Sequence, residues 1–335
     1  MSATPVTATL EPRPRTAAEQ SLRRNGWNLA LFALMGGLLV IARLLRPEYG
    51  ASDLQSLATE VLPIAFAAAA QAVCVIAGGV DLSVGSMMAF TTVTAAVLME
   101  DRSDEFALVA VILVLLLGLS IGAINGLLIV VSRVPDIVVT LAMSFVWAGC
   151  ALLVLNTPGG GAADWFKSLS VGSWGTEWVP RALMLLAIAV GVVWIPLRRS
   201  RLGLSIYAIG SDHVAALRSG VDVRRTKVAA YAVTGLFCAM GGLALTMNTG
   251  IGTPVPGPYT LASVAAIVLG GVSLVGGRGG MLGPLIAAFI LALVRYDLFF
   301  LGVDANYSTV IQGIVLVVVV MIGGLVAIRR SRRRA

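Results

Sequence analysis

An apolar segment of 26 residues without a charged side chain, residues 106–131, is one of several such segments in this chain. Only 12% of the 335 residues are charged, whereas soluble globular proteins carry about 25%. A chain this long with half that charge cannot cover a water-facing surface, which excludes a soluble enzyme, a disordered chain and a collagen-like fibre. Because about 20 apolar residues span the hydrocarbon core as a helix, the sequence predicts an all-α, polytopic transmembrane protein.

The apolar runs also exclude a transmembrane β-barrel, whose segments of about 10 residues alternate apolar and polar side chains. We expect one transmembrane domain, residues 27–328, between a cytoplasmic tail of residues 1–26 and a basic cytoplasmic tail of residues 329–335. Residues 1–26 contain no apolar segment typical of a signal peptide. The ten expected spans are residues 27–45, 57–78, 86–99, 106–131, 137–155, 182–197, 228–247, 259–275, 281–303 and 307–328.

The basic residues are distributed unevenly between the loops of this arrangement. With the N-terminus in the cytoplasm, 18 of the 24 Lys and Arg residues fall on the cytoplasmic side and 5 outside, with Arg295 inside a span. Cytoplasmic loops carry an excess of Lys and Arg, so we expect both termini inside a cell whose inner (plasma) membrane holds the protein. This bias explains the net charge of +7 without nucleic acid as a partner.

A glycine-rich sequence occurs twice, at a spacing of 192 residues. Residues 78–85 are Gly-Gly-Val-Asp-Leu-Ser-Val-Gly, and residues 270–277 are Gly-Gly-Val-Ser-Leu-Val-Gly-Gly. Both copies would follow a span that crosses from outside to inside, and transporters are often built from repeated halves. Two repeat-like halves are one interpretation, and chance recurrence in a chain with 37 glycines is the other.

Patterns typical of catalysis and metal binding are missing from the sequence. His213 is the only histidine, and the three cysteines, Cys74, Cys150 and Cys238, lie in apolar runs without metal-ligand spacing. No G-x-x-x-x-G-K-[ST] motif occurs, so any ATP hydrolysis would need a separate polypeptide. We therefore expect no enzyme activity, no catalytic residue, no metal and no cofactor.

The first glycine-rich copy carries a carboxylate, Asp81, between the second and third spans. Ionisable side chains at membrane depth are usually paired or line a polar cavity, which makes Asp81 a candidate functional residue. Alternatively, Asp81 accepts backbone N–H groups at the start of the third span, where the helix dipole favours its charge. Arg295, Asp297 and Glu60 lie near outer span ends, and we expect them to face the membrane interface.

The basic connection of residues 198–227 contains a sequence typical of a short helix. Ser211 is the expected N-cap and Gly220 the expected C′ residue, while Val214 and Leu217 share one face. A short helix exposed to water needs packing to be stable, so it packs either on its own protein or in a groove of a partner. The segment comprises Ser211, Asp212, His213, Val214, Ala215, Ala216, Leu217, Arg218, Ser219 and Gly220.

Five sequence features in order along residues 55–325 carry a resemblance to a known family. The most specific contains Gly78, Gly79, Asp81, Leu82, Ser83, Gly85 and Ser86. The others are Asn125-Gly126, Val134-Pro135 with Val139-Thr140-Leu141, Gly203 through Gly210 to Gly220-Val221, and Gly270-Gly271 through Gly276-Gly277 to Gly283. Together they resemble the membrane permease subunit of bacterial ATP-binding cassette (ABC) importers for ribose, xylose, arabinose and related sugars, within the branched-chain amino acid and monosaccharide permease superfamily.

This resemblance implies a second permease copy or a paralogue, two cytoplasmic ATP-binding subunits, and a periplasmic or secreted sugar-binding protein. It also implies that residues 211–220 are the coupling helix that docks on the ATP-binding subunit. The chain departs from the family after Tyr259, where Thr260 and Ala262 replace the usual acidic residues. A role of those carboxylates cannot be carried over, so a shifted substrate and a structural substitution both stay open.

The predicted function is import of a monosaccharide or related polyol, with ATP hydrolysed by separate subunits. Neutral hydrogen-bonding residues of the spans are candidates for the sugar path, although bonds between helices are their commoner role. These candidates are Gln71, Thr91, Asn125, Ser144, Asn248 and Gln312. The alternatives are a secondary transporter driven by an ion gradient, with a proton or sodium site such as Asp81, and a channel or structural scaffold.

Overall fold

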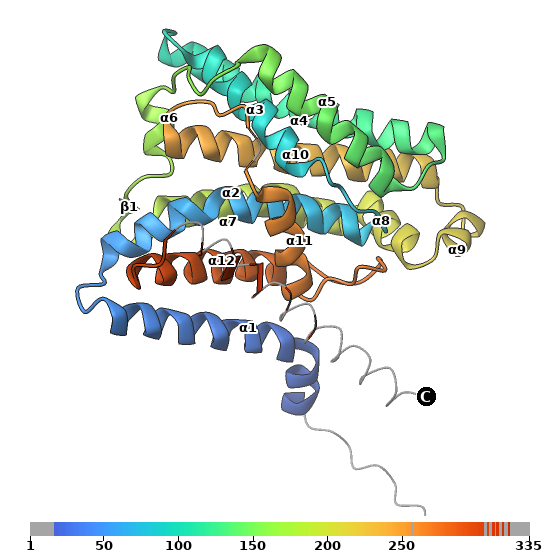
Figure 1. Ribbon diagram of the computed structural model, residues 1–335. Coiled ribbons are helices and arrows are strands. Elements are labelled where there is room, and N and C mark those ends of the chain that lie inside the picture. Colours follow the sequence, from blue (N-terminus) through green and yellow to red (C-terminus); the bar gives the residue numbers. More distant parts are fainter. Residues whose placement is uncertain are drawn as a thin grey trace, which may run out of the picture.

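The computed structural model describes residues 17–255 and 257–304 and seven further positions between 307 and 321, with the surroundings of side chains from residue 26 onward. Figure 1 shows the arrangement of the elements. They are α1 (Ala17–Leu45), α2 (Ala51–Ile76), α3 (Val84–Met99), α4 (Asp104–Ser132), α5 (Asp136–Val154), α6 (Asp164–Ser168), β1 (Ser173–Trp174), β2 (Thr176–Pro180), α7 (Arg181–Arg199), α8 (Arg201–Ser211), α9 (His213–Arg218), α10 (Val223–Thr249), α11 (Tyr259–Leu269) and α12 (Leu282–Phe300).

Seven of these helices are long and apolar enough to cross a membrane, which confirms the expected polytopic helical protein. They are α2, α4, α5, α7, α10, α12 and the part of α1 from Gly26 to Leu45. The helices α3 and α11 are apolar but shorter, with 16 and 11 residues. Nine expected spans therefore coincide with helices, whereas most of the tenth, residues 307–328, and the tail 329–335 lie outside the described residues.

The eighth expected span, residues 259–275, is wrong at its end, because α11 stops at Leu269. Gly271 has φ +76°, a left-handed conformation that favours glycine, and Val272 N–H donates to Ile267 O. This Schellman arrangement ends a helix. Eleven residues rise only about 16 Å, so α11 is long enough for about half of the roughly 30 Å hydrocarbon core.

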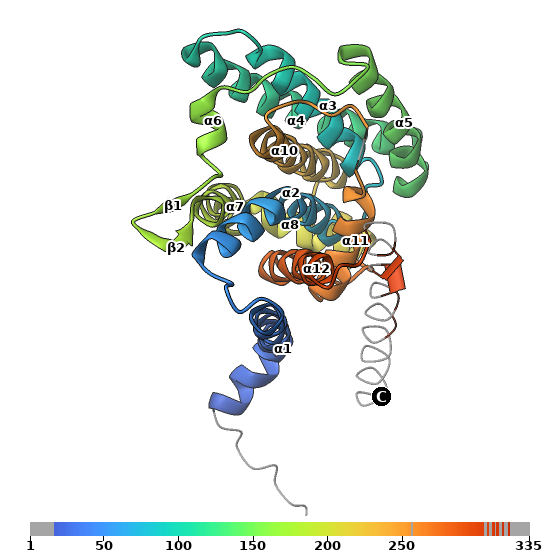
Figure 2. The same ribbon diagram turned by 60° about the vertical axis from the view of Figure 1, so that its left-hand side comes forward.

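Helix α2 lies at the centre of the fold, and 89% of its apolar window is buried. It packs against α7, α10, α11 and α12, which surround it in the two views of Figures 1 and 2. Small side chains permit this packing, since residues 67–70 are four consecutive alanines that are all fully buried. A helix that is apolar on every face is expected to be buried in this way.

A second close helix pair is formed by α4 and α10. Gly118, Gly122 and Gly126 recur every four residues on one face of α4. A Cβ at Gly122 would lie 2.2 Å from Tyr231 O and 2.9 Å from Gly235 Cα on α10. Stripes of small residues with this spacing let transmembrane helices approach closely, so these glycines fix the distance between the two helices.

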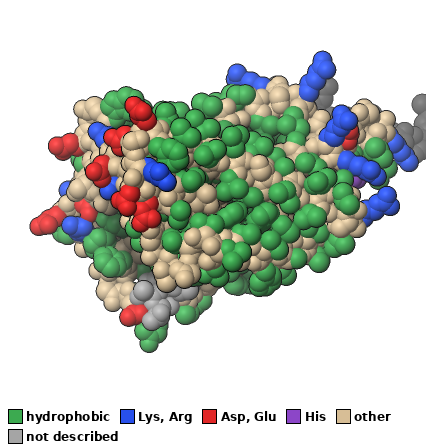
Figure 3. Space-filling view, turned by 90° about the horizontal axis from the view of Figure 1, so that it is seen from above, with side chains coloured by type: hydrophobic (Ala, Val, Ile, Leu, Met, Phe, Trp, Pro, Cys, Tyr) green, Lys and Arg blue, Asp and Glu red, His purple; other side chains and the backbone are tan. Residues whose placement is uncertain are grey.

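The surface of the bundle is apolar in its middle and charged at its ends. Figure 3 shows a broad hydrophobic band between one end where acidic side chains gather and another where basic side chains gather. Leu116, Leu153 and Val192 are 56%, 88% and 68% exposed, respectively. Apolar surface of this extent is rare on soluble monomers, and a lipid bilayer is the environment that it suits.

The expected loop of residues 156–181 contains structure of its own. It holds α6 and an antiparallel hairpin in which Ser173 pairs with Pro180 and Trp174 with Thr176. Gly175 has φ +76° and makes the turn between the strands. The expected all-α fold is therefore modified by one short hairpin. We call the end of the molecule that carries this hairpin and α6 the hairpin end, and the opposite end, with α8 and α9, the α9 end (Figure 1).

Candidate functional site

The glycine-rich break between α2 and α3 owes its shape to two glycines. Gly78 has φ +80°, and Gly79 N–H donates to Cys74 O, so α2 ends in a Schellman arrangement. A Cβ at Gly79 would lie 2.4 Å from Asp136 Oδ2 and 2.6 Å from Tyr231 Oη. The first glycine is required for its backbone conformation and the second for the space it leaves.

A buried chain of hydrogen bonds holds the residues after these glycines. Asp81 Oδ1 accepts from Ser83 N–H at 2.8 Å and from Ser83 Oγ–H at 2.6 Å. Asn125 Nδ2 donates to Ser83 Oγ at 2.9 Å, and Asn125 Oδ1 accepts from Trp147 Nε1 at 3.0 Å. Asp81, Ser83 and Asn125 are fully buried. The chain of bonds therefore joins the break to α4 and α5 away from water.

Gln71 holds the backbone of Asp81 from α2. Its carboxamide donates to Asp81 O at 3.0 Å and accepts from Asp81 N–H at 3.3 Å. The Asp81 carboxylate accepts the N–H of Ser83, the N-cap residue of α3, so it holds the turn that leads into α3 without bonding the first N–H groups of the helix itself. The second carboxylate oxygen, Oδ2, has no hydrogen-bond partner among the described residues.

The first turns of α5 hold the break from a third side. Thr140 Oγ1 accepts from Leu82 N–H at 3.1 Å and lies 3.2 Å from Val80 O. The Thr140 side chain is fully buried, so both bonds form in an environment without competing water. This contact gives a structural reason for a threonine at this position of the sequence pattern.

One turn earlier on α5, Asp136 forms a cluster that the sequence analysis missed. Its Oδ1 lies 2.7 Å from Lys227 Nζ, and its Oδ2 accepts from Tyr231 Oη at 2.9 Å. Lys227 is one of only two lysines in the chain. That rarity was the signal available in the sequence, but sequence alone does not bring Lys227 next to Asp136, 91 residues away.

The two glycine-rich copies meet in space, with α8 between them. Gly277 N–H donates to Ile76 O at 3.0 Å. A Cβ at Gly210, near the end of α8, would lie 1.9 Å from Ile76 O and 2.6 Å from Gly277 N. A Cβ at Gly276 would lie 2.8 Å from Gly78 Cα. The backbones of both copies and of α8 are thus in direct contact, with no room for side chains.

Both copies end a helix with a left-handed glycine, but the two glycines are offset by one residue from the pairs in the sequence alignment. The left-handed residue is Gly78 after α2 and Gly271 after α11. The sequence alignment instead pairs Gly78 with Gly270. The two helix ends therefore share a backbone conformation at positions that the sequence alignment does not pair.

The expected short helix is present as α9, and its N-cap differs from the expected one. Ser211 is the last residue of α8, so Asp212 takes the cap position instead. Asp212 Oδ1 accepts from the N–H groups of Val214 and Ala215 at 2.9 Å each. Gly220 has φ +83° and is the C′ residue, as expected.

Helix α9 divides its faces between its own protein and solvent. Ala216 is buried, whereas Val214 and Leu217 are 57% and 62% exposed. His213, Arg218 and Ser219 are also exposed. The helix therefore packs on its own protein through a small residue and leaves an apolar face without a partner in the chain's described part.

Helix α8 is also attached by a side chain to the residues that follow the second glycine-rich copy. Tyr207 Oη donates to Gly279 O at 2.9 Å. Burial raises the pKa of Tyr207, and the charge of Arg198 opposes this shift more weakly. The phenol is therefore protonated at neutral pH and remains a hydrogen-bond donor.

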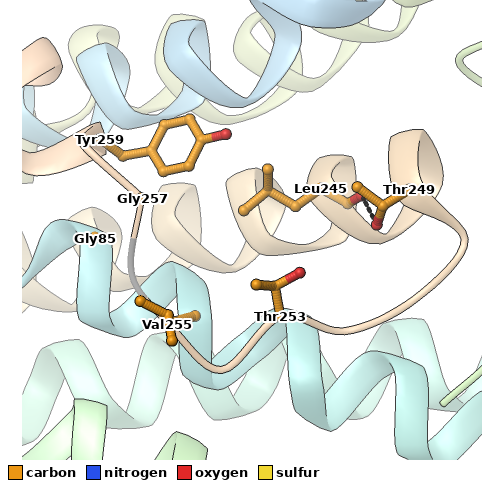
Figure 4. A pocket seen from close by; sticks show the side chains of 8 residues that line it. Gly85, Leu245, Thr249, Thr253, Val255, Gly257 and Tyr259 are labelled. Atoms are coloured by element: carbon orange, nitrogen blue, oxygen red, sulfur yellow. Dashed lines mark hydrogen bonds between the residues drawn. The ribbon is translucent and has the colours of Figure 1, made fainter. Parts of the chain in front are cut away.

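A cavity of about 190 Å³ lies beside the start of α3. Its lining comes from α3, from the end of α10 and from the segment that leads into α11, and Figure 4 shows the Thr253 hydroxyl and the Tyr259 phenol among mostly apolar groups. Thr249 Oγ1 is occupied by its own helix, through a bond to Leu245 O. The lining residues are Gly85, Ala89, Leu245, Thr249, Thr253, Val255, Gly257 and Tyr259.

Thr260, next to this cavity, caps α3 from the neighbouring helix. Gly85 N–H donates to Thr260 Oγ1 at 2.9 Å. Gly85 is the second residue of α3, and the first N–H groups of a helix have no partner within it. Ala262 is partly buried against the core. These contacts support the interpretation of both departures as structural substitutions.

A larger cavity of about 520 Å³, lined mostly by polar residues, lies at the hairpin end. Asn248 Nδ2 donates to Thr59 O at 2.7 Å there, and Asn248 Oδ1 is buried without a partner among the described residues. Glu60 pairs with Arg295 at 3.4 Å instead of facing the interface alone. The prediction that Asp297 faces the membrane interface is wrong, because this residue is only 6% exposed. The lining residues are Ser52, Gln55, Ser56, Thr59, Glu60, Val171, Gly172 and Asn248.

The six path candidates fall into different surroundings. Gln71, Thr91 and Asn125 are fully buried, and Thr91 Oγ1 bonds within its own helix to Met87 O. Ser144 is half-buried on α5, Asn248 lines the hairpin-end cavity, and Gln312 lies outside the described residues. The structure therefore does not gather the five described candidates into one site.

The described residues contain no group of three or more His, Cys, Asp or Glu side chains that could hold a metal ion. Cys74, Cys150 and Cys238 are free thiols.

Comparison with known proteins gives a consistent result over nearly the whole chain. Residues 54–320 match the protein family described as branched-chain amino acid transport system / permease component. The chain is 30% identical over 299 residues to the ribose import permease protein RbsC of Escherichia coli (strain K12), covering 88% of this chain and 92% of the relative. It is 33% identical over 290 residues to RbsC of Bacillus subtilis (strain 168), covering 85% and 89%.

A third relative is named for a different cargo. The chain is 30% identical over 328 residues to the autoinducer 2 import system permease protein LsrD of Escherichia coli O9:H4 (strain HS), covering 92% of this chain and 95% of the relative. No solved structure matches the chain.

Proposed function

Because the chain belongs to the family of permease components of branched-chain amino acid transport systems, we propose that it carries a monosaccharide or related polyol through the membrane for an ABC importer. It is a multi-pass permease subunit of the cell membrane. Permeases of this kind work with ATP-binding subunits and a substrate-binding protein. The observation that supports a sugar as the transported solute is the similarity to ribose import permeases over 88% of the chain.

In this proposal the α9 end faces the cytoplasm, both termini lie on the same side, and the chain crosses the membrane ten times. Support comes from the basic side chains that gather at one end of the hydrophobic band and the acidic ones at the other (Figure 3), because cytoplasmic loops carry the excess of Lys and Arg. Residues 307–328 would form the tenth span. The shared helix-end conformation at Gly78 and Gly271 supports two repeat-like halves.

The ATP-binding subunit docks on α9 in this account. Val214 and Leu217 give α9 an exposed apolar face, while Ala216 fixes the helix to the permease. A short amphipathic helix presented in this way fits a groove of a partner. Asp212 and Gly220 define its two ends. Residues 211–220 thus act as the coupling helix.

Alternating access would use the contact of α8 with the two glycine-rich copies. ATP binding moves α9 and therefore α8, and Gly210 transmits this movement to the end of α2 and to Gly277, since their backbones touch. ATP and the loaded binding protein must each favour one conformation over the other, or neither could shift the equilibrium.

The solute would pass near the cavity of Figure 4, which combines apolar walls with the hydroxyl groups of Thr253 and Tyr259. Ser144 and Gln312 stay candidates for the same path. Gln71 and Asn125 are better explained by the bonds that tie α2 and α4 to the break, and Thr91 by its bond within α3. The path would lie between this chain and a second permease, either a copy of itself or a paralogue.

The test is uptake of radiolabelled D-ribose, D-xylose and L-arabinose into proteoliposomes. The permease is reconstituted with its ATP-binding subunits and sugar-binding protein, with and without ATP inside. We expect uptake of at least one sugar only when ATP and both partners are present. Uptake by the permease alone, driven by a pH or sodium gradient, would instead establish a secondary transporter.

A further inference from the structure

We propose that the Asp136–Lys227–Tyr231 cluster is a positioning element that transmits the movement of α9 to the glycine-rich break between α2 and α3. The inference rests on the proposed function, because it concerns how an ATP-binding subunit would act on this permease. It adds three positioning residues from α5 and α10, outside both the coupling helix and the break itself.

The cluster uses both oxygens of one carboxylate. Asp136 Oδ1 lies 2.7 Å from Lys227 Nζ, and Tyr231 Oη donates to Asp136 Oδ2 at 2.9 Å. The side chains of Asp136 and Lys227 are only 12% and 17% exposed, and Tyr231 is fully buried. The ion pair is therefore largely protected from water, and its geometry is defined on both sides of the carboxylate.

A short connection joins the cluster to α9. Val221 N–H donates to Ala216 O, which ties the residue after α9 back onto that helix. Asp222 then caps α10, because its Oδ1 accepts from Arg225 N–H at 3.0 Å. Lys227 follows within the first turns of α10. A movement of α9 is thus passed to Lys227 through capped helix ends and not through a flexible loop.

The other side of the cluster touches the break directly. A Cβ at Gly79 would lie 2.4 Å from Asp136 Oδ2, so the carboxylate rests against the backbone of the break. Thr140, one turn further on α5, binds Leu82 N–H at 3.1 Å. The start of α5 therefore holds residues on both sides of Val80, and a shift of Asp136 shifts the break with it.

The charges make this connection stiff. Separating a buried ion pair leaves each charge without its partner, which is strongly unfavourable, whereas replacing both partners by neutral groups is often tolerated. The starts of α5 and α10 are therefore expected to move together between conformations. This is the physical link through which two distant sites can bias one element.

The decisive variant is the double substitution Asp136→Asn with Lys227→Met, which leaves no unpaired buried charge. The complete importer is reconstituted, and its ATPase activity is measured with and without binding protein loaded with the sugar that the wild-type complex transports. We expect normal assembly and thermal stability but at least a fivefold fall in the ratio of stimulated to basal ATPase, the lower limit of typical coupling effects.

Each single variant, Asp136→Asn or Lys227→Met, should lower the ratio at least as much as the double variant, because it leaves the other charge buried without its partner. The control is Lys167→Gln, which removes the other lysine and its exposed pair with Asp164 at the hairpin end, and should keep the wild-type ratio. An assembled double variant with the wild-type ratio would overturn the proposal.

Two further outcomes are also decisive. If the double variant does not assemble, Tyr231→Phe removes only one hydrogen bond of the cluster, and an unchanged ratio in that variant would contradict the positioning role. If the wild-type complex shows no ATP-dependent uptake, the proposed function fails, and the positioning role fails with it. If the wild-type complex shows ATP-dependent uptake and the double variant loses the stimulation of its ATPase, the positioning role is supported separately from the proposed function.

Discussion

Gly210 of α8 meets Ile76 of α2 backbone to backbone, so closely that a Cβ on Gly210 would lie 1.9 Å from the Ile76 carbonyl oxygen. The same carbonyl accepts the N–H of Gly277 at 3.0 Å. The segment that leads into α9 therefore rests directly on the end of the central helix. This contact gives a physical route from the α9 end to the interior of the bundle.

Gly210→Ala should destabilise the protein, because the added methyl group has no space unless two backbones separate. Overpacking of this kind costs about 1–3 kcal/mol, and thermal unfolding in detergent measures it. The matched control is Gly191→Ala on α7, where the nearest atom, Ile195 Cδ1, is 4.0 Å away. That change should stabilise the helix by about 0.5–1 kcal/mol, and equal effects of the two variants would contradict the contact.

Asn125→Ala should lower stability through the buried hydrogen bonds of the break. It removes the acceptor of Trp147 Nε1 and the donor to Ser83 Oγ. A buried polar group left without a partner costs about 1–3 kcal/mol. Ser120→Ala on the same helix is the control, since Ser120 is exposed and bonds only to Leu116 O; a similar loss of thermal stability in both variants would show that the network does not matter.

Thr260→Val should weaken the start of α3, because Gly85 N–H loses its acceptor. Loss of a capping group costs about 1 kcal/mol. Hydrogen exchange at Gly85 should accelerate and the melting temperature should fall, whereas Thr260→Ser retains the hydroxyl and should behave like the wild type. Unchanged exchange in the valine variant would contradict the capping role.

Cysteine labelling should separate the two ends of the molecule. In a Cys150→Ser background, a membrane-impermeant maleimide should label Glu177→Cys at the hairpin end in intact cells. It should label Ser219→Cys at the α9 end only after the cells are permeabilised, because the α9 end is proposed to be cytoplasmic. Glu177 and Ser219 are both exposed, so labelling of both in intact cells would contradict the proposed orientation.

Hydropathy and charge predicted the helical membrane fold because the surrounding lipid or water determines which residues along the whole chain are apolar and which are charged. Most helix ends lie within a few residues of the expected limits, but α1, α2 and α10 begin 10, 6 and 5 residues earlier than expected. Helix α11 ends at Leu269 instead of residue 275, where Gly271 adopts a left-handed conformation. Composition could not show that α11 ends there. The sequence analysis also missed the hairpin, because it depends on the left-handed conformation of Gly175 within residues that we expected to form a loop.

The site was predictable only where it is local in sequence. The expected short helix lies within residues 211–220, because capping and helix termination depend on neighbouring residues. Its N-cap is Asp212 and not Ser211, which is the last residue of α8. The pair of Asp136 with Lys227 joins helices far apart in the chain. Nothing in a single sequence indicates a contact between two residues that lie so far apart in the chain.

The most direct measurement of the central claim is the response of the importer to a change on α9 alone. The double variant Val214→Glu with Leu217→Glu places two charges on an exposed apolar face, so the permease should fold as before. Anchoring apolar residues of an interface contribute about 2 kcal/mol or more each. We predict loss of the ATP-binding subunits on purification, and of ATP-dependent sugar uptake, at an unchanged melting temperature of the permease. An assembled complex whose ATPase still responds to loaded binding protein would contradict the account.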